Sequence, residues 1–459
     1  MADPEKKPGG IVERTAAVPA SPEQVYTWLT RAGALQHLLP PWSGARVMEQ
    51  PPAIADGARV GLALPAGPLT LRWAARYRNT IPGRQFVAEQ VSGPFRRWVH
   101  LHRMTPEDNG YTQVLDRVEF DLPLGHAGRL AAPLVRRRIG RLLDYRHAVL
   151  ADEFRQGMPA QPLRVAVTGA TGFIGSRLVP ALRAAGHSVR RIVRHNPTGD
   201  DIVWDPDAGL LDARQLEGTD AVIHLAGASI AGGRWTAERK AVLVRSRTAG
   251  TALLARTLAR LARRPAVLVS MSAAGYYGDR GDTGLTESSE PGDDFLATTA
   301  TAWEASANPA REAGIRVVHP RPQLVLSPAG GALPRLALPI RLGAGGRLGT
   351  GRQWISWIAL DDVLGALRYM IEHDDLHGPV NLVAPEAITN AAFMHTLGRV
   401  LHRPSRIPAP AFALRLLLGE MADALLLASQ RVGPAALARS GYRMRYPELE
   451  GALRHVMGQ

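Results

Sequence analysis

The stretch Gly169-Ala170-Thr171-Gly172-Phe173-Ile174-Gly175 decides the fold of the second half of this chain. It lies between residues 163–168, which have the pattern of a buried parallel strand, and residues 176–185, which have the pattern of a helix. Glycine lets the backbone turn tightly and approach a pyrophosphate, which the N–H groups and dipole of the helix N-terminus then hold. Because strand, helix and glycine spacing agree, the stretch predicts a dinucleotide-binding domain.

Composition is that of a globular protein and excludes several kinds of chemistry. The chain has 459 residues, of which 46% are hydrophobic and 21% are charged, enough for two or three domains. It has no cysteine, which excludes disulfides, thiolate metal sites and a cysteine nucleophile. Residues 1–10 lack an apolar run, so we expect no signal peptide. Residues 412–428 are interrupted by charged side chains, so we expect no membrane span and a cytoplasmic protein.

The net charge of +14 raises the question of nucleic-acid binding. The densest basic cluster is Arg136-Arg137-Arg138, and the other arginines are spread along the chain without a basic tail or interleaved aromatic residues. This distribution favours solvated surface faces over a nucleic-acid site. We therefore expect a small-molecule substrate and no nucleic-acid partner, and the sequence leaves the oligomeric state open.

The chain is predicted to form two domains, residues 10–156 and residues 163–457. A short segment rich in proline and polar residues separates them. Strand alternation dominates the first domain, between a helix at residues 22–29 and a long helix at residues 128–154, and this pattern predicts an α+β domain with a bent antiparallel sheet around its last helix. Strands and helices alternate in the second domain, which predicts an α/β doubly wound parallel sheet of the Rossmann type.

Two histidines of the first domain, His100 and His102, are two positions apart and therefore face one side of a strand. They are half of a possible metal site, but no third ligand is evident nearby in the sequence. The pattern favours two polar histidines on a strand face, and no metal is expected.

Four segments characterise the first domain: Ser21-Pro22-Glu23-Gln24-Val25-Tyr26, Pro40-Pro41-Trp42, Pro82-Gly83-Arg84-Gln85-Phe86 and Val91-Ser92-Gly93-Pro94-Phe95. Through these segments the domain resembles the SRPBCC superfamily, which has the START-like or polyketide-cyclase-like helix-grip fold. The resemblance implies an apolar cavity between the sheet and the long helix. Two interpretations stay open: a pocket for a hydrophobic ligand, or a filled core that serves as a docking module.

The second strand of the nucleotide-binding domain indicates which cofactor is bound. Residues 187–193 form this strand, and Arg194 follows directly where NAD-specific sites usually have an acidic residue. A basic residue suits a 2′-phosphate, so the sequence predicts NADP. The third strand, at residues 220–225, ends in small residues that let the backbone pass close to the cofactor. The expected cofactor-binding residues are Gly169, Thr171, Gly172, Phe173, Ile174, Gly175, Arg194, Leu225, Ala226 and Gly227.

Several motifs lie along the second domain: the glycine stretch, Trp204-Asp205-Pro206, His224-Leu225-Ala226-Gly227, Arg234-Trp235-Thr236, Ser272-Ala273-Ala274-Gly275-Tyr276-Tyr277-Gly278, Trp303-Glu304 and Gly351-Arg352-Gln353-Trp354. With these motifs the domain resembles the extended short-chain dehydrogenase/reductases, and within them an atypical subgroup of epimerase-family proteins of unknown substrate. The resemblance covers about residues 163–456. Some members of this subgroup also carry an SRPBCC domain in front.

This resemblance locates the expected chemistry and shows departures from it. Typical members use a Tyr-x-x-x-Lys pair for proton transfer, and here those two positions fall on Leu296 and Ala300. The usual asparagine is replaced by Arg247, as is typical of the subgroup, and Arg247 is a further candidate for binding the cofactor or an anionic substrate. The upstream serine remains as Ser272. A histidine typical of the subgroup is replaced by Ala359.

Another acid must therefore act if the protein is an enzyme. The candidates for catalysis are Ser272, Tyr276 and Tyr277, with the carboxylates of Glu287, Asp293 and Asp294 as further options. In the C-terminal part, Trp354, Trp357 and the leucines of residues 414–427 either wall an apolar cleft or, as we prefer for the leucines, pack in the core of the lobe.

Three functions follow as hypotheses. The leading one is an NADP-dependent oxidoreductase or epimerase-like enzyme acting on a small, partly apolar carbonyl or hydroxyl substrate. The second is a non-catalytic NADP(H)-binding sensor or scaffold, which the missing tyrosine and lysine favour. The third is a lipid or polyketide carrier in which the nucleotide-binding half regulates release.

Overall fold

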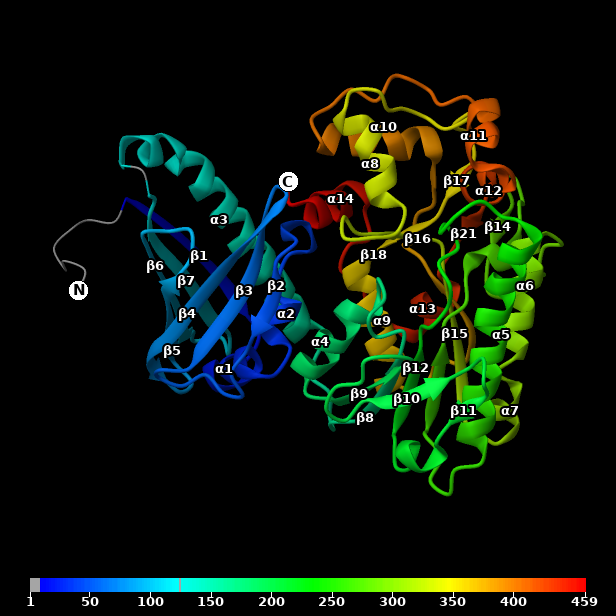
Figure 1. Cartoon of the computed structure of the whole chain (residues 1–459), viewed down its shortest axis with the longest axis horizontal. Helices are drawn as coiled ribbons and strands as arrows, with labels where there is room; N and C mark the ends of the chain where they lie inside the picture. Colours follow the sequence, from blue (N-terminus) through cyan, green and yellow to red (C-terminus); the bar gives the residue numbers. More distant parts are fainter. Residues whose placement is uncertain (1–8, 124) are drawn as a thin grey trace. The chain divides into compact units, whose positions relative to one another are not determined.

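The computed structural model describes residues 9–123 and 125–459 (Figure 1). The chain divides into two compact units, which are described separately. The first comprises residues through Ala160 together with Pro180–Gly186 and Gly458, and the second comprises Gln161–Val179, His187–Met457 and Gln459.

The first unit is built on one antiparallel sheet of seven strands, in the order β1-β7-β6-β5-β4-β3-β2. The long helix α3 (Gly125–Arg155) packs against β1, and α1 (Pro22–Thr30) starts at a capping box between Ser21 and Gln24. The predicted bent sheet and long helix are confirmed. The strands are β1 (Gly10–Val18), β2 (Arg46–Glu49), β3 (Arg59–Ala66), β4 (Leu69–Ile81), β5 (Gln85–Ser92), β6 (Arg97–Pro106) and β7 (Thr112–Asp121), with the short helices α2 (Ala34–His37) and η1 (Pro41–Ser43) between β1 and β2.

The hairpin of β6 and β7 positions the polar interior of this unit. Its register places His100 opposite Val118 and His102 opposite Asp116. Val118 belongs to one apolar cluster of the unit, while Val114, two positions before Asp116 on β7, belongs to another. Asp116 therefore lies on the inward face of the sheet, between two apolar clusters.

The second unit is built on an eight-stranded sheet in the order β11-β10-β9-β8-β12-β13-β15-β19. All neighbours are parallel except β10 and β11, and helices cover both faces, with α5 and α7 on one side and α9 on the other (Figure 1). The predicted Rossmann-type sheet is confirmed. Its strands are β8 (Arg164–Thr168), β9 (Ser188–Val193), β10 (Ile202–Asp205), β11 (Leu210–Leu211), β12 (Ala221–His224), β13 (Val267–Ser270), β15 (Arg316–Pro322) and β19 (Gly378–Leu382).

The helices of the sheet region follow the predicted alternation. They are α4 (Gly175–Ala185), η2 (Ala213–Leu216), α5 (Ala237–Ala259), η3 (Ala274–Tyr277), α6 (Phe295–Ala305), α7 (Asn308–Glu312) and α9 (Leu360–Glu372). The order of strands in the sheet reverses at β8, because the next strand, β9, lies on one side of β8 and the later strand β12 lies on the other. In open parallel sheets such a switch point forms the crevice where ligands bind.

The C-terminal lobe adds small sheets and helices beyond β15. Its apolar core contains Trp357, Ala359 and residues from α8, α10 and α14. The prediction that the leucines of residues 414–427 pack in the core of the lobe is wrong for Leu416 and Leu417. On α11 these two residues are 78% and 70% exposed. Among the described residues, none of the helices combines the length and the apolar character needed to cross a membrane. The lobe and its neighbouring strands are β14 (Gly284–Leu285), β16 (Leu324–Leu326), α8 (Leu333–Arg341), β17 (Trp354–Ile355), β18 (Trp357–Ala359), β20 (Ile388–Thr389), α10 (Asn390–Val400), α11 (Ala411–Leu418), α12 (Glu420–Ala422), η4 (Asp423–Leu427), β21 (Arg431–Val432), α13 (Ala435–Ser440) and α14 (Leu449–Met457).

Candidate functional site

The glycine loop between β8 and α4 closes tightly on the end of β12. A Cβ added to Gly169, which has a φ of +63°, would lie 2.8 Å from the carbonyl carbon of Leu225. A Cβ on Gly175 would lie 2.2 Å from the carbonyl oxygen of Gly169. On Gly172, in contrast, a Cβ would meet only that same oxygen, at 3.1 Å. The first and last glycines thus permit close backbone packing, and the middle one brings the backbone close to the start of the helix, where a phosphate can be bound.

Buried side chains hold the two strand ends in register with each other. The Thr168 hydroxyl accepts hydrogen bonds from the backbone N–H groups of Leu225 and Ala226, at 3.1 and 3.2 Å. The His224 ring lies between the hydroxyls of Thr168 and Thr251, at 2.7 and 3.0 Å. Burial lowers the pKa of His224 to about 4, so the ring is neutral near pH 7. This network fixes the floor of the nucleotide crevice.

Two arginines lie at the edge of this crevice. The pairing of Thr168 with Ile192 places Arg194, two residues later, at the same sheet edge as the glycine loop, and Arg194 is exposed. Arg247 lies beside Gly227, since a Cβ there would meet its guanidinium carbon at 3.6 Å. Burial, with a smaller contribution from Arg239, lowers the pKa of Arg247 to about 10, so it remains a cation. The predicted cofactor residues are therefore gathered at one edge of the sheet.

Ser272 lies in a buried polar cluster just past the end of β13. The sequence pattern of residues 267–272 predicts a strand through Ser272. The strand ends at Ser270 instead, but the Ser272 N–H still donates to the Pro320 carbonyl of β15 at 2.8 Å. The Ser272 hydroxyl donates to Oε1 of Glu304 at 2.6 Å. Glu304 also accepts two hydrogen bonds from Arg321, Nε to Oε1 and Nη2 to Oε2, both at 2.7 Å. Oε1 of Glu304 therefore accepts from both the serine hydroxyl and the guanidinium, so the carboxylate fixes the direction of the Ser272 O–H bond.

The two tyrosines of the motif have different environments. Tyr277 is fully buried, donates its hydroxyl to Asn381 at 2.6 Å and accepts from Arg321 at 3.0 Å. Burial raises the pKa of Tyr277, which makes proton release from this hydroxyl unfavourable. Tyr276 is half-buried, and its ring lies on the Arg321 guanidinium, 3.5 Å from centroid to Cζ. Tyr277 thus holds the cluster together, whereas Tyr276 covers it.

The positions of the usual Tyr-x-x-x-Lys pair are apolar and buried, because Leu296 is 9% and Ala300 is 3% exposed. Glu304 follows Ala300 by four residues on α6, one turn further along the same helix face. The ionisable group of this helix is therefore displaced by one turn from the usual lysine position.

The further carboxylate candidates have structural partners or lie at the surface. Asp294 caps α6 by accepting from the Ala297 N–H at 2.8 Å, and Glu287 accepts from the N–H groups of Asn381 and Ala436, both at 3.0 Å. Asp293 is exposed.

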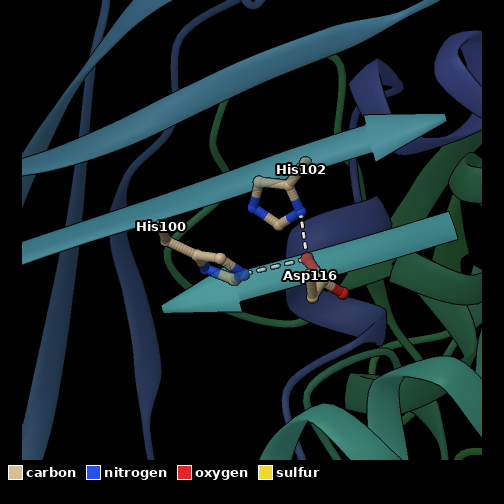
Figure 2. Close-up of side chains that lie close together, drawn as sticks. All are labelled: His100, His102 and Asp116. Carbon is tan, nitrogen blue, oxygen red and sulfur yellow. Dashed lines mark hydrogen bonds and ion pairs between the residues drawn. The ribbon is translucent and has the colours of Figure 1, made fainter. Parts of the chain in front are cut away.

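In the first unit, the expectation that His100 and His102 lack a third ligand-type neighbour is wrong. His100 Nε2 and His102 Nδ1 lie 2.8 and 2.5 Å from Oδ1 of Asp116 (Figure 2). His147 Nε2 lies 2.6 Å from Oδ2 of the same carboxylate. Burial, and to a smaller extent His102, lowers the pKa of His100 to about 3. The sequence did contain a signal: pairing the two strands symmetrically about Asn109 of the turn sets Asp116 opposite His102.

The sequence interpretation missed Glu304, Arg321 and Asn381 as members of one cluster. Tyr277 and Asn381 are 104 residues apart, and Arg321 and Glu304 are 17 apart. No local spacing predicts such contacts. The proximity of Glu304 to the lysine position on α6 was the one signal available.

Family models match three parts of the chain. Residues 165–383 match the NAD dependent epimerase/dehydratase family, residues 18–144 match the family of polyketide cyclase / dehydrase and lipid transport, and residues 409–456 match a domain of unknown function, DUF1731. A relative from Mycobacterium bovis, the epimerase family protein Mb2239, is 42% identical over 290 residues, which cover 63% of this chain and 96% of that protein. The chain belongs to the NAD dependent epimerase/dehydratase family.

Other epimerase-family proteins are also similar to this chain in sequence or structure. The Bacillus subtilis epimerase family protein YfhF is 36% identical, over 64% of this chain and 98% of its own length. A crystal structure described as the nucleoside-diphosphate sugar epimerase from Corynebacterium glutamicum has a TM-score of 0.80 and 31% identity, and covers 97% of this chain and 90% of that one. The human epimerase family protein SDR39U1, solved with NADPH, has a TM-score of 0.60 and 35% identity, over 64% of this chain and 99% of that one. The two resemblances inferred from the sequence are confirmed.

Proposed function

We propose that this epimerase-family chain binds NADP(H) and acts as an oxidoreductase or epimerase-like enzyme on a small, partly apolar carbonyl or hydroxyl substrate. The observation that carries the proposal is the glycine loop, in which Gly169 packs against Leu225 and a Cβ on Gly172 would meet only the Gly169 carbonyl oxygen, at 3.1 Å. The exposed Arg194 at the same edge suits a 2′-phosphate. The human relative solved with NADPH supports the same cofactor.

When bound, NADP(H) supplies or accepts a hydride at its nicotinamide ring. The chain's own part is then to move a proton at the substrate oxygen. We assign this exchange to Oγ of Ser272, whose hydroxyl donates to the Glu304 carboxylate. In oxidation of a hydroxyl, Oγ takes the substrate proton as its own proton passes to Glu304, and in reduction of a carbonyl the proton returns along the same path. Arg321 orients that carboxylate through two hydrogen bonds. Tyr276, on the outer side of Arg321, is a candidate for contact with substrate.

A non-catalytic NADP(H) sensor is the second candidate, and a specific observation favours it. Leu296 and Ala300 are buried where the typical proton donor and its lysine lie, and neither side chain can transfer a proton. Under this alternative the Ser272–Glu304–Arg321 cluster serves only to stabilise the fold around the cofactor.

Calorimetry with NADPH and NADH tests cofactor choice. We expect the wild type to prefer NADPH, and Arg194→Glu to weaken NADPH binding by about 10–100-fold, as expected for loss of a charge-assisted hydrogen bond. Arg256→Glu makes the same change of charge at an exposed position on α5 and should leave the affinity unchanged. If the wild type ignores both nucleotides, the proposed function is wrong.

Turnover separates the enzyme from the sensor. NADPH oxidation is followed across a panel of small carbonyl compounds, with Ser272→Ala as the test variant. The enzyme predicts a rate that falls by about 10²–10⁴-fold in the variant while NADPH still binds. NADPH binding with no NADPH oxidation by any compound would favour the sensor over an oxidoreductase.

A further inference from the structure

We propose that His100, His102 and Asp116 form a binding site for a divalent transition-metal ion inside the first unit (Figure 2). The site is separate from the nucleotide crevice and is built entirely from β6 and β7. It does not depend on the proposed function.

The ligand atoms already converge. His100 Nε2, His102 Nδ1 and an Asp116 carboxylate oxygen all lie within 4.8 Å of one another. Zinc bonds to histidine nitrogen and carboxylate oxygen are about 2.0–2.2 Å, so ligand atoms around one ion stand about 3–3.5 Å apart. The two contacts to Oδ1 are 2.8 and 2.5 Å. Small side-chain rotations that separate these atoms would therefore admit an ion in place of the hydrogen-bonding protons.

The hydrogen-bonded pair of β6 and β7 holds these side chains in fixed positions. His100 and His102 face the same side of β6, and the register sets His102 opposite Asp116 on β7. The side chains of His100, His102 and Asp116 are only 8%, 6% and 4% exposed. Phe86, on β5, stacks on the His102 ring with centroids 4.3 Å apart, which fixes the ring orientation. Such support on strands is what a preorganised metal site requires.

His147 supplies the supporting contact that metal-binding carboxylates usually have. Its Nε2 lies 2.6 Å from Oδ2 of Asp116, so it holds the second carboxylate oxygen and leaves Oδ1 toward the two strand histidines. This contact comes from α3, and thus from a different layer of the unit. A carboxylate held this way presents one oxygen in a fixed direction.

The donor set defines the class of ion. Two imidazole nitrogens and one carboxylate oxygen suit Zn²⁺, Fe²⁺ and their first-row neighbours, whereas Ca²⁺ and Mg²⁺ prefer oxygen ligands. Three protein ligands leave further coordination positions for water or for an oxygen-bearing ligand. A buried carboxylate also requires a cationic partner, and the competing explanation is a protonated histidine with no metal.

The full chain, stripped with a chelator, is titrated with Zn²⁺ by calorimetry, and Co²⁺ is then added to record visible absorption. We expect one tight equivalent of Zn²⁺ and ligand-field bands of histidine-bound Co²⁺. His102→Gln and Asp116→Asn should abolish both signals, and His147→Gln should weaken Zn²⁺ binding by about 10–100-fold. His195→Gln removes an exposed histidine of the second unit and should change nothing.

Any of three results overturns the proposal. The wild type binds no Zn²⁺ ion tightly, or tight Zn²⁺ binding persists in both His102→Gln and Asp116→Asn, or tight Zn²⁺ binding is lost in His195→Gln. Circular dichroism reports whether the core variants fold. If they do not fold, the Co²⁺ spectrum of the wild type decides, because absence of ligand-field bands leaves the protonated histidine as the explanation.

Discussion

Removing the negative charge of Glu304 should destabilise the second unit strongly. Glu304 and Arg321 form a two-pronged ion pair with both contacts at 2.7 Å, and their side chains are 14% and 3% exposed. Burial lowers the pKa of Arg321, but the hydrogen bonds and charge of Glu304 more than offset this and raise it above its usual value. In Glu304→Gln, the guanidinium therefore stays charged and water cannot reach it to replace the lost carboxylate.

The expected cost follows from this burial. Breaking a buried pair by removing one partner costs about 3–5 kcal/mol, because the remaining charge is left uncompensated. Tyr277 still accepts from Arg321 and the Tyr276 ring still covers it, so we expect the lower part of that range. For a unit of this size, about 3 kcal/mol corresponds to a fall in melting temperature of roughly 5 °C.

Urea unfolding and calorimetry of the full chain measure the effect. Glu450→Gln is the control, since Glu450 pairs with Arg399 and Arg454 at the surface, where solvent screens the charges, and it should cost much less than Glu304→Gln. Replacing both partners, in Glu304→Met with Arg321→Met, should cost clearly less than the sum of the two single changes. A cost of Glu304→Gln equal to that of Glu450→Gln, or strict additivity in the double variant, would refute the reasoning.

Two further changes have definite expected outcomes. In Gly175→Ala the new Cβ would lie 2.2 Å from the Gly169 carbonyl oxygen, so we expect a loss of about 1–3 kcal/mol and weaker NADPH binding, whereas Gly284→Ala, with open space around it, should be nearly neutral in both assays. Burial lowers the pKa of His224 from 6.5 to about 4, so its contribution is complete above pH 6.5 and is lost as the pH falls to 4, by on the order of 3 kcal/mol. Urea unfolding between pH 7 and 4 should show a shallower loss in His224→Gln, and equal pH dependence in both proteins would contradict this origin.

The sequence was sufficient to predict structure wherever the pattern depends on residues close together in the chain. Alternation predicted the antiparallel sheet of the first unit, and the glycine spacing predicted the turn at Gly169, because both depend on neighbouring residues. The end of β13 was set two residues too late, since Ser272 keeps a strand-like hydrogen bond to Pro320 beyond the regular ladder.

The sequence indicated where Ser272, Tyr276 and Tyr277 lie, but it did not indicate what each side chain contacts. Motif spacing put Ser272, Tyr276 and Tyr277 at the carboxyl edge of the sheet, where the structure has them. The role of Tyr277 depends on Asn381 and Arg321, which only the tertiary fold brings to its hydroxyl. Exposure of the α11 leucines was missed for a similar reason, because an apolar stretch does not itself show whether another element covers it.

The contacts of Asn381 have a consequence for the order in which this protein can mature during synthesis. Its amide accepts from Tyr277 and donates to the Gly433 carbonyl, so one side chain joins segments made far apart in time. In a ribosome-bound chain that ends before residue 381, Arg321 and Tyr277 are already present. The Asn381 amide that accepts from the Tyr277 hydroxyl is still missing. The nucleotide-binding sheet is therefore expected to reach its final compactness only late in translation, when the C-terminal lobe has emerged.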